Sequence, residues 1–262
     1  MQCTGWGWPE TSAAPALDVH LSSAALAPPG TERFFSERLV RLPHLPAYCM
    51  RPPVEAKPEP VERFGLPAGA NLYLCAQNLR KVHPDFDAVL GAILRSDPRG
   101  VVAFVHDKLP TFGELLRRRW ERTLGHVLDR LVILPRQVPN DYIRLVASAH
   151  VMLDTPHFSG ANTAYDALAV GAPAVTLPGE VPRSRYTAEL YRSAGIEDCV
   201  ATSVDEYVNI AVGLGTDATR RNDLRERILS TAPAVFENRA AVGQLEAFFA
   251  ETLASTSPAG VG

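Results

Sequence analysis

The chain has 262 residues and a formal net charge of −3, with 46% apolar and 21% charged residues. This composition is ordinary for a soluble globular protein and lacks the basic excess of proteins that bind nucleic acid or anionic membranes. No apolar run approaches the roughly 18 residues of a membrane span, and the N-terminus lacks the pattern of a secretory signal. The four cysteines form no C-x-x-C motif, so we expect neither disulfides nor a zinc knuckle, and a cytoplasmic location.

The N-terminal region, residues 1–43, is short for an independent domain, because so few residues bury too little apolar surface. Residues 17–21 have the pattern of a strand and residues 31–40 that of a helix. We therefore expect this region to be the end of a larger domain, or an appendage that packs on the rest of the chain.

Prolines are concentrated in residues 44–67. Proline lacks a backbone donor and fixes φ, so this stretch can form neither a regular helix nor a central strand. We interpret it as an extended linker. At the other end of the chain, residues 257–262 are expected to be a disordered tail.

From residue 68 to 256, strand patterns alternate with helix patterns. Strands are expected at 71–75, 101–105, 131–134, 151–153 and 174–177. Helices are expected at 84–94, 112–128 (with a solvated arginine face at 117–119), 141–148, 162–170, 184–194, 204–214, 217–230 and 235–253. Such alternation predicts an α/β fold with a parallel sheet, in which ligands bind beyond the carboxyl ends of the strands.

The densest polar group lies between Asp154 and Asp166, where a strand end leads through a glycine-containing loop into a helix. Asn162, Thr163 and Asp166 fall in the first turns of that helix, and residues three or four apart share a face. Free backbone N–H groups and the positive end of the helix dipole suit a diphosphate there. The alternative interpretation is simple capping of the helix by Ser159 or Asn162.

A second polar group follows the first strand of the long segment, between Gln77 and Pro84. Lys81 within it lies at the carboxyl edge of the sheet, where a point charge can meet a phosphate; the alternative is an ordinary surface lysine. The run 85–87 has the D-x-D pattern that binds metal in some sugar transferases, but its place at a helix start favours capping. Because no paired histidine spacing, P-loop or G-x-S-x-G motif occurs, we predict no metal site and no cofactor.

Together these motifs resemble the C-terminal catalytic half of glycosyltransferase family 41, the O-linked N-acetylglucosamine transferases. They follow the family's order along nearly the whole chain. The matching segments are 5–12, 36–43, 78–84, 153–155, 160–163, 166–168, 171–173, 175–179, 184–185, 205–208 and 224–225.

The resemblance implies a GT-B fold, in which two Rossmann-like domains face a cleft. It also implies a metal-independent enzyme that transfers a sugar, most simply N-acetylglucosamine from its UDP donor, to Ser or Thr of a protein acceptor. Lys81 is implied to be the catalytic residue that contacts the diphosphate and stabilises the departing UDP. Gly160, Asn162 and Thr163 are implied to hold the phosphates, and Asp166 the ribose.

Four further residues are implied to lie near the nucleotide, three of them around its base. Asn78 occupies a position where the family often has glutamine, and Gln137 and Pro139 fall in the loop that frames uracil through backbone groups. Tyr142 stands where the family has a histidine that stacks on uracil, so the aromatic face is kept and the hydrogen bonding changes.

Two departures from the family pattern leave alternatives open. Asn162 in the sequence Gly160-Ala161-Asn162-Thr163 resembles the variant of related bacterial protein glucosyltransferases, so UDP-glucose is an alternative donor. The chain is also expected to start inside the N-terminal catalytic domain, without the family's histidines and TPR repeats. A missing domain or partner chain would then complete the cleft, and a non-catalytic module that binds UDP-sugar is the alternative function.

Overall fold

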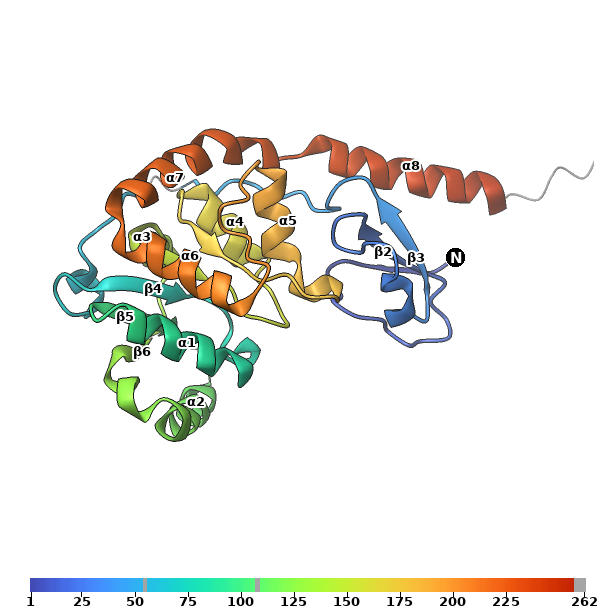
Figure 1. Ribbon diagram of the computed structural model, residues 1–262. Helices are drawn as coiled ribbons and strands as arrows, with labels where there is room; N and C mark the ends of the chain where they lie inside the picture. Colours follow the sequence, from blue (N-terminus) through green and yellow to red (C-terminus); the bar gives the residue numbers. More distant parts are fainter. Residues whose placement is uncertain (54–55, 107–108, 257–262) are drawn as a thin grey trace, which may run out of the picture. The chain divides into compact units, whose positions relative to one another are not determined.

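The computed structural model describes residues 1–53, 56–106 and 109–256. The predicted tail 257–262 lies outside these residues. The chain forms two compact units, which are described separately: a large unit of residues 51–179 and 184–234, and a small unit of residues 1–50, 180–183 and, at the C-terminal end, 235 onward. Figure 1 labels the elements of both.

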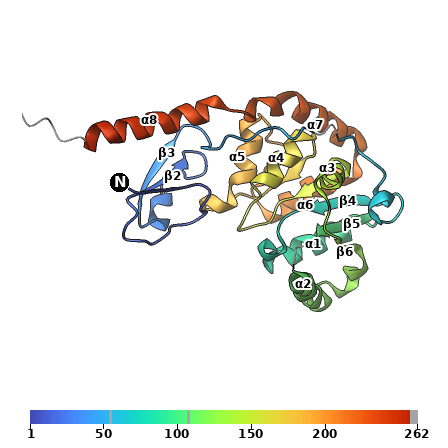
Figure 2. The ribbon, with the colours of Figure 1, turned by 180° about the vertical axis from the view of Figure 1, so that it is seen from behind.

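The large unit is built on a five-stranded sheet in which every pair of neighbouring strands is parallel. Its order is β6-β5-β4-β7-β8. The strands are β4 (Asn71–Cys75), β5 (Gly100–Val105), β6 (Leu131–Leu134), β7 (Val151–Leu153) and β8 (Ala174–Val175). The central strands are almost continuously apolar because helices cover both faces of the sheet (Figures 1 and 2).

Helices connect and flank these strands in the alternation that the sequence predicts. In the large unit they are α1 (Asp85–Ser96), α2 (Pro110–Thr123), α3 (Pro139–Ser148), α4 (Asn162–Ala169), α5 (Tyr186–Ser193), α6 (Val204–Thr216) and α7 (Ala218–Thr231). Helices α1 and α6 pack side by side, with the rings of Phe86 and Tyr207 edge to face at 6.1 Å. Side-chain oxygens of Ser203 and Asp217 cap the starts of α6 and α7.

Two elements are shorter than predicted. The helix expected at 112–128 ends at Thr123, and a 3-10 helix, Gly125–Arg130, follows it. The strand expected at 174–177 is limited to β8, and Thr176 continues it only as an isolated bridge to Val200. The remaining 3-10 helices are Thr31–Phe34, Val61–Phe64, Leu79–Lys81, Pro182–Ser184 and Ala232–Val235.

Asp87 of the D-x-D pattern is a core residue. It is only 3% exposed and accepts two hydrogen bonds from the Arg119 guanidinium, at 2.7 and 2.9 Å. Trp120 and Thr123 donate to the same carboxylate. The expectation of a fully solvated arginine face on α2 is therefore wrong at Arg119, because that side chain neutralises a buried acid between α1 and α2.

The small unit contains a three-stranded parallel sheet of order β1-β2-β3, formed by Cys3–Gly5, Val19–Ser23 and Arg38–Leu42. The expectation of a helix at 31–40 is wrong. Its first residues form only a 3-10 turn, and its last residues begin β3, which pairs with β2 along five residues. Helix α8 (Arg239–Thr256) also belongs to this unit, and Gln244 exchanges hydrogen bonds with the backbone of His44.

In its described residues, the proline-rich segment forms no α-helix or strand and one 3-10 turn, at Val61–Phe64. The backbone N–H of Glu59 donates to Ser148 on α3, so this part of the segment is attached to the large unit. The two units divide between residues 50 and 51, inside the predicted linker 44–67, whereas α8, predicted within the large domain, falls with the small unit. Among the described residues, no helix is both long and apolar enough to cross a bilayer.

Candidate nucleotide-sugar site

The two polar groups predicted from the sequence meet at one edge of the large unit's sheet. Strands β4 and β7 are parallel neighbours, so the residues that follow their carboxyl ends must lie side by side. The segment after β4 contains Gln77 and Lys81, and the segment after β7 runs from Asp154 to the start of α4.

Asp154 organises this edge, a role that its sequence context does not predict. Its carboxylate is buried and accepts hydrogen bonds of 2.7 Å from the Ser159 hydroxyl, the Gly160 backbone N–H and the Thr176 hydroxyl. Burial raises the pKa of Asp154, and these hydrogen bonds oppose that effect. Tyr207 of α6 donates to the backbone oxygen of Asp154 at 2.9 Å. These bonds to Ser159 and Gly160 therefore fix the conformation of the loop that leads into α4.

Gln77 connects the two segments directly. Its amide nitrogen lies 2.7 Å from the Thr163 hydroxyl on the first turn of α4, and 3.5 Å from Asp154. A Cβ added at Gly160 would lie 2.2 Å from that nitrogen and 2.3 Å from the Thr163 hydroxyl. Glycine is therefore required at residue 160 for the loop and the helix to approach Gln77.

Lys81 reaches across from the first segment to the second. Its ammonium donates to the Ser159 backbone oxygen at 2.9 Å and to the Gln77 side-chain oxygen at 3.2 Å, and it lies 4.2 Å from the centre of the Phe158 ring. Burial lowers the pKa of Lys81, and the nearby Asp154 carboxylate partly offsets this. None of these direct contacts is an anion, so an incoming phosphate would give this partly buried cation a charged partner.

Helix α4 starts without a side-chain cap. The residue at its N-cap position is Ala161, and no side chain accepts a bond from the first turn. Ser159 is occupied by Asp154 and Thr187 instead. The capping alternative therefore does not explain these residues, and the helix presents its first N–H groups beside the exposed Asn162.

Asp166 and Tyr142 form a pair between α4 and α3. The Tyr142 hydroxyl and the Asp166 carboxylate are near enough to influence each other's pKa. Burial raises the pKa of Asp166 to about 6, and the Tyr142 hydroxyl opposes this rise. Burial and the charge of Asp166 together raise the pKa of Tyr142. This pair brings together two of the residues implied to contact the nucleoside.

The structure does not direct every implied residue toward this cluster. The Asn78 side chain caps the 3-10 turn by accepting from the backbone and side chain of Arg80, and its neighbour Gln77 points into the cluster in its place. Gln137 donates to the backbone oxygen of Pro135, and Pro139 is the first residue of α3. The resemblance assigned an amide at residue 78 to the site, whereas in the structure the amide that contacts Thr163 and Lys81 belongs to residue 77.

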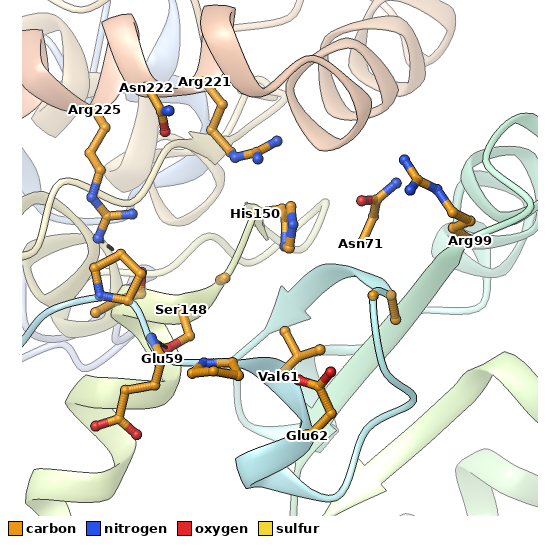
Figure 3. Close-up of a pocket in the computed structure, with 16 residues that line it drawn as sticks. Glu59, Val61, Glu62, Asn71, Arg99, Ser148, His150, Arg221, Asn222 and Arg225 are labelled. Carbon is orange, nitrogen blue, oxygen red and sulfur yellow. Dashed lines mark hydrogen bonds between the residues drawn. The ribbon is translucent and has the colours of Figure 1, made fainter.

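A cavity of about 440 Å³ lies at the opposite edge of the sheet. None of the residues that the family resemblance implies in the site lines it. Asn71 and His150, which start or precede β4 and β7, line it together with Arg221 and Arg225 (Figure 3). Arg221 donates to carbonyls at the end of α6, and Arg225 to the oxygens of Ala147 and Val170. These arginines stabilise helix ends, so we assign the cavity a structural role.

The α/β fold with parallel sheets is of the GT-B type seen in glycosyltransferases of known structure. The structure of a mutant Thermobaculum terrenum O-GlcNAc transferase matches with a TM-score of 0.80 and 28% identity, over 95% of this chain and 47% of that one. The Anabaena protein HepE, solved with UDP and glucose, has the same fold at 14% identity, with a TM-score of 0.57 over 91% of this chain and 63% of its own.

The family model for glycosyl transferase family 41 matches residues 58–243. The chain belongs to this family. A tomato (Solanum lycopersicum) protein named probable UDP-N-acetylglucosamine–peptide N-acetylglucosaminyltransferase SPINDLY is 30% identical over 245 residues, which are 89% of this chain and 25% of that protein. An Arabidopsis thaliana protein with the same enzyme name, SEC, is 26% identical over 87% of this chain and 24% of its own. The chain spans about a quarter of the length of these relatives.

Proposed function

We propose that the large unit is the UDP-sugar-binding half of a protein O-glycosyltransferase, which transfers N-acetylglucosamine from UDP-N-acetylglucosamine to Ser or Thr without a metal. One observation carries the proposal: the Lys81 ammonium and the uncapped start of α4 lie on one sheet edge, joined through the Ser159 oxygen and the Gln77–Thr163 bond. The names of the relatives support the choice of sugar and acceptor.

The proposed chemistry follows from where charge develops. The acceptor hydroxyl forms a bond to C1 of the sugar and loses its proton to solvent, while the bond from C1 to the UDP oxygen breaks, so the diphosphate gains negative charge. Lys81, the Thr163 hydroxyl, Asn162 and the first N–H groups of α4 stabilise that charge, as preorganised donors do at an oxyanion. We assign Asp166 to the ribose hydroxyls, and Tyr142 to the face of the base.

The donor and the activity can be tested on the chain itself. We expect UDP at 100 times its Kd to stabilise the protein by about 2.7 kcal/mol, and labelled sugar to pass from UDP-N-acetylglucosamine to a Ser/Thr peptide in the presence of EDTA. Faster transfer from UDP-glucose would assign the alternative donor indicated by Asn162. Stabilisation without transfer would identify a binding module that needs a further domain or chain, and no stabilisation by UDP would refute the proposed site.

Asp166→Asn should weaken UDP binding and stabilise the ligand-free protein. The folded-state pKa of about 6 lies above the ordinary aspartate value of 3.8. The charged carboxylate therefore destabilises the folded wild type above about pH 6, and this effect vanishes below about pH 4. Because Asp166 is partly exposed, solvent screening reduces the free energy that corresponds to this shift. We expect the free energy of unfolding of the variant to exceed that of the wild type by about 1–2 kcal/mol at pH 8. Urea unfolding at pH 4 and pH 8 measures this difference.

The same variant isolates the role of Asp166 in binding. We expect wild-type affinity for UDP to fall between pH 7 and pH 5 more steeply than that of Asp166→Asn. Protonation of the UDP phosphate is common to both titrations and cancels in the comparison. Parallel pH profiles for the two proteins would show that Asp166 does not contact the ribose in its charged form.

A further inference from the structure

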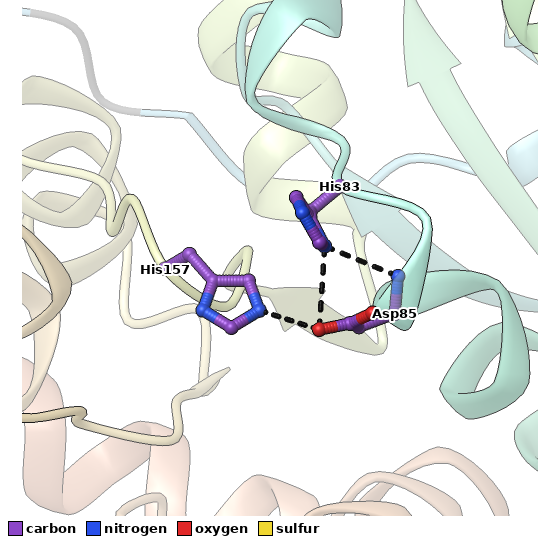
Figure 4. A group of neighbouring side chains, drawn as sticks. All are labelled: His83, Asp85 and His157. Carbon is purple, nitrogen blue, oxygen red and sulfur yellow. Dashed lines mark hydrogen bonds and ion pairs between the residues drawn. The ribbon is translucent and has the colours of Figure 1, made fainter.

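Three exposed side chains with metal-ligating atoms converge beside the candidate site. His83 follows the 3-10 turn that contains Lys81, Asp85 is the first residue of α1, and His157 lies in the loop after β7. Figure 4 shows both imidazole rings directed at the Asp85 carboxylate. Asp85 belongs to the same D-x-D pattern as Asp87, but the Asp87 carboxylate is buried and bound to Arg119 in the core, so it takes no part in the cluster.

The distances within the cluster are close to those of a metal site. The Nε2 atom of His157 lies 2.9 Å from Oδ2 of Asp85, and Nδ1 of His83 lies 3.4 Å from the same oxygen. The three ligand atoms, one from each residue, all lie within 4.8 Å of one another. Ligands bonded at about 2.0–2.1 Å in a tetrahedron lie roughly 3.3 Å apart. Small side-chain rotations therefore suffice to surround an ion.

The donor set selects the class of ion. Two imidazole nitrogens and one carboxylate oxygen suit Zn²⁺ and its neighbours in the first transition row, whereas Mg²⁺ and Ca²⁺ prefer oxygen ligands alone. Three protein ligands leave the fourth position of a tetrahedral ion to water. All three residues are exposed, so the ion has a path of entry. Binding would replace the long 3.3 Å bond that Nδ1 of His83 accepts from the Asp85 N–H.

We propose that His83, Asp85 and His157 form a Zn²⁺ site that ties the loop after β7 to the start of α1. The adjacent residues of this loop, Phe158 and Ser159, are the ones that contact the Lys81 ammonium. An ion at the cluster would therefore restrain the loop on which the position of Lys81 depends. The ion is a tether and takes no part in the transfer step, so the inference does not rest on the proposed function.

Isothermal titration of the metal-free full chain with ZnCl₂, without nucleotide, tests the site. We expect one saturable Zn²⁺ per chain and a rise in the thermal unfolding midpoint that EDTA reverses. Asp85→Asn and His157→Gln should each weaken the affinity by at least about tenfold. Titration with Co²⁺ should give the intense visible absorption of a four-coordinate ion, without the charge-transfer band that a cysteine ligand would add.

His44→Gln is the matched control, because His44 is an exposed histidine in the small unit. It should bind Zn²⁺ as the wild type does. Circular dichroism checks that the variants are folded. Equal affinity in the wild type and Asp85→Asn, a thiolate band with Co²⁺, or the absence of a saturable site would each overturn the inference, whatever the outcome of the UDP experiments.

Discussion

Lys81→Ala is expected to remove most of the stabilisation that UDP gives, while the ligand-free protein stays folded. The ammonium is partly buried, and its direct partners are the Ser159 oxygen, the Gln77 oxygen and the Phe158 ring. Its loss therefore costs the ligand-free state little, whereas a diphosphate loses a charge-assisted contact worth about 1.5–3 kcal/mol. We expect Kd for UDP to rise roughly 10- to 100-fold, and transfer, where it occurs, to fall by about 10²–10³.

Thermal shift and calorimetric titration with UDP measure this change. Lys57→Ala is the matched control, because Lys57 is exposed in the proline-rich segment and its substitution removes the same charge. It should bind UDP as the wild type does. If the two variants bind UDP equally well, Lys81 is not the diphosphate cation.

Asp154→Ala is expected to cause a large loss of stability. The carboxylate is 4% exposed and accepts from two hydroxyls and one backbone N–H. Its removal leaves these buried donors without an acceptor and takes away a negative charge that favours the charged form of Lys81, which together typically cost about 3–5 kcal/mol. The loop before α4 should also lose its fixed conformation, so UDP binding should fail even where the protein remains folded.

Urea unfolding measures the stability change, and two further variants define its cause. Asp129→Ala alters an exposed carboxylate and should change the unfolding free energy by no more than about 0.5 kcal/mol. Asp154→Asn keeps the size of the side chain and should fall between Asp154→Ala and the wild type. A loss below about 1 kcal/mol for Asp154→Ala would show that the hydrogen-bond network does not hold this edge together.

The strands and helices of the large unit follow from the sequence because each is set by local periodicity. The strand at Asn71–Cys75 is apolar throughout, and the helices between strands have one apolar stripe each. The small unit was harder to predict. Strand β3 forms because Arg38–Leu42 pairs with Val19–Ser23, and a pairing between distant segments leaves no signal in a local window.

The candidate site was predictable at the level of its segments, and less so at the level of side-chain direction. The two strand ends and the start of α4 meet because parallel topology requires it. Whether Gln77 or Asn78 points into the cluster depends on the 3-10 turn, which uses the Asn78 oxygen as its cap. Asp154 was visible as an acid directly after a buried strand, but only the fold shows that three donors converge on it.

The position of α8 bears on how the protein is made. The small unit joins residues from both ends of the chain, and the bonds between His44 and Gln244 span 200 positions. During synthesis on the ribosome, strands β1 to β3 emerge before the large unit, and α8 emerges after it. The helix therefore cannot join these strands until the intervening large unit has been translated.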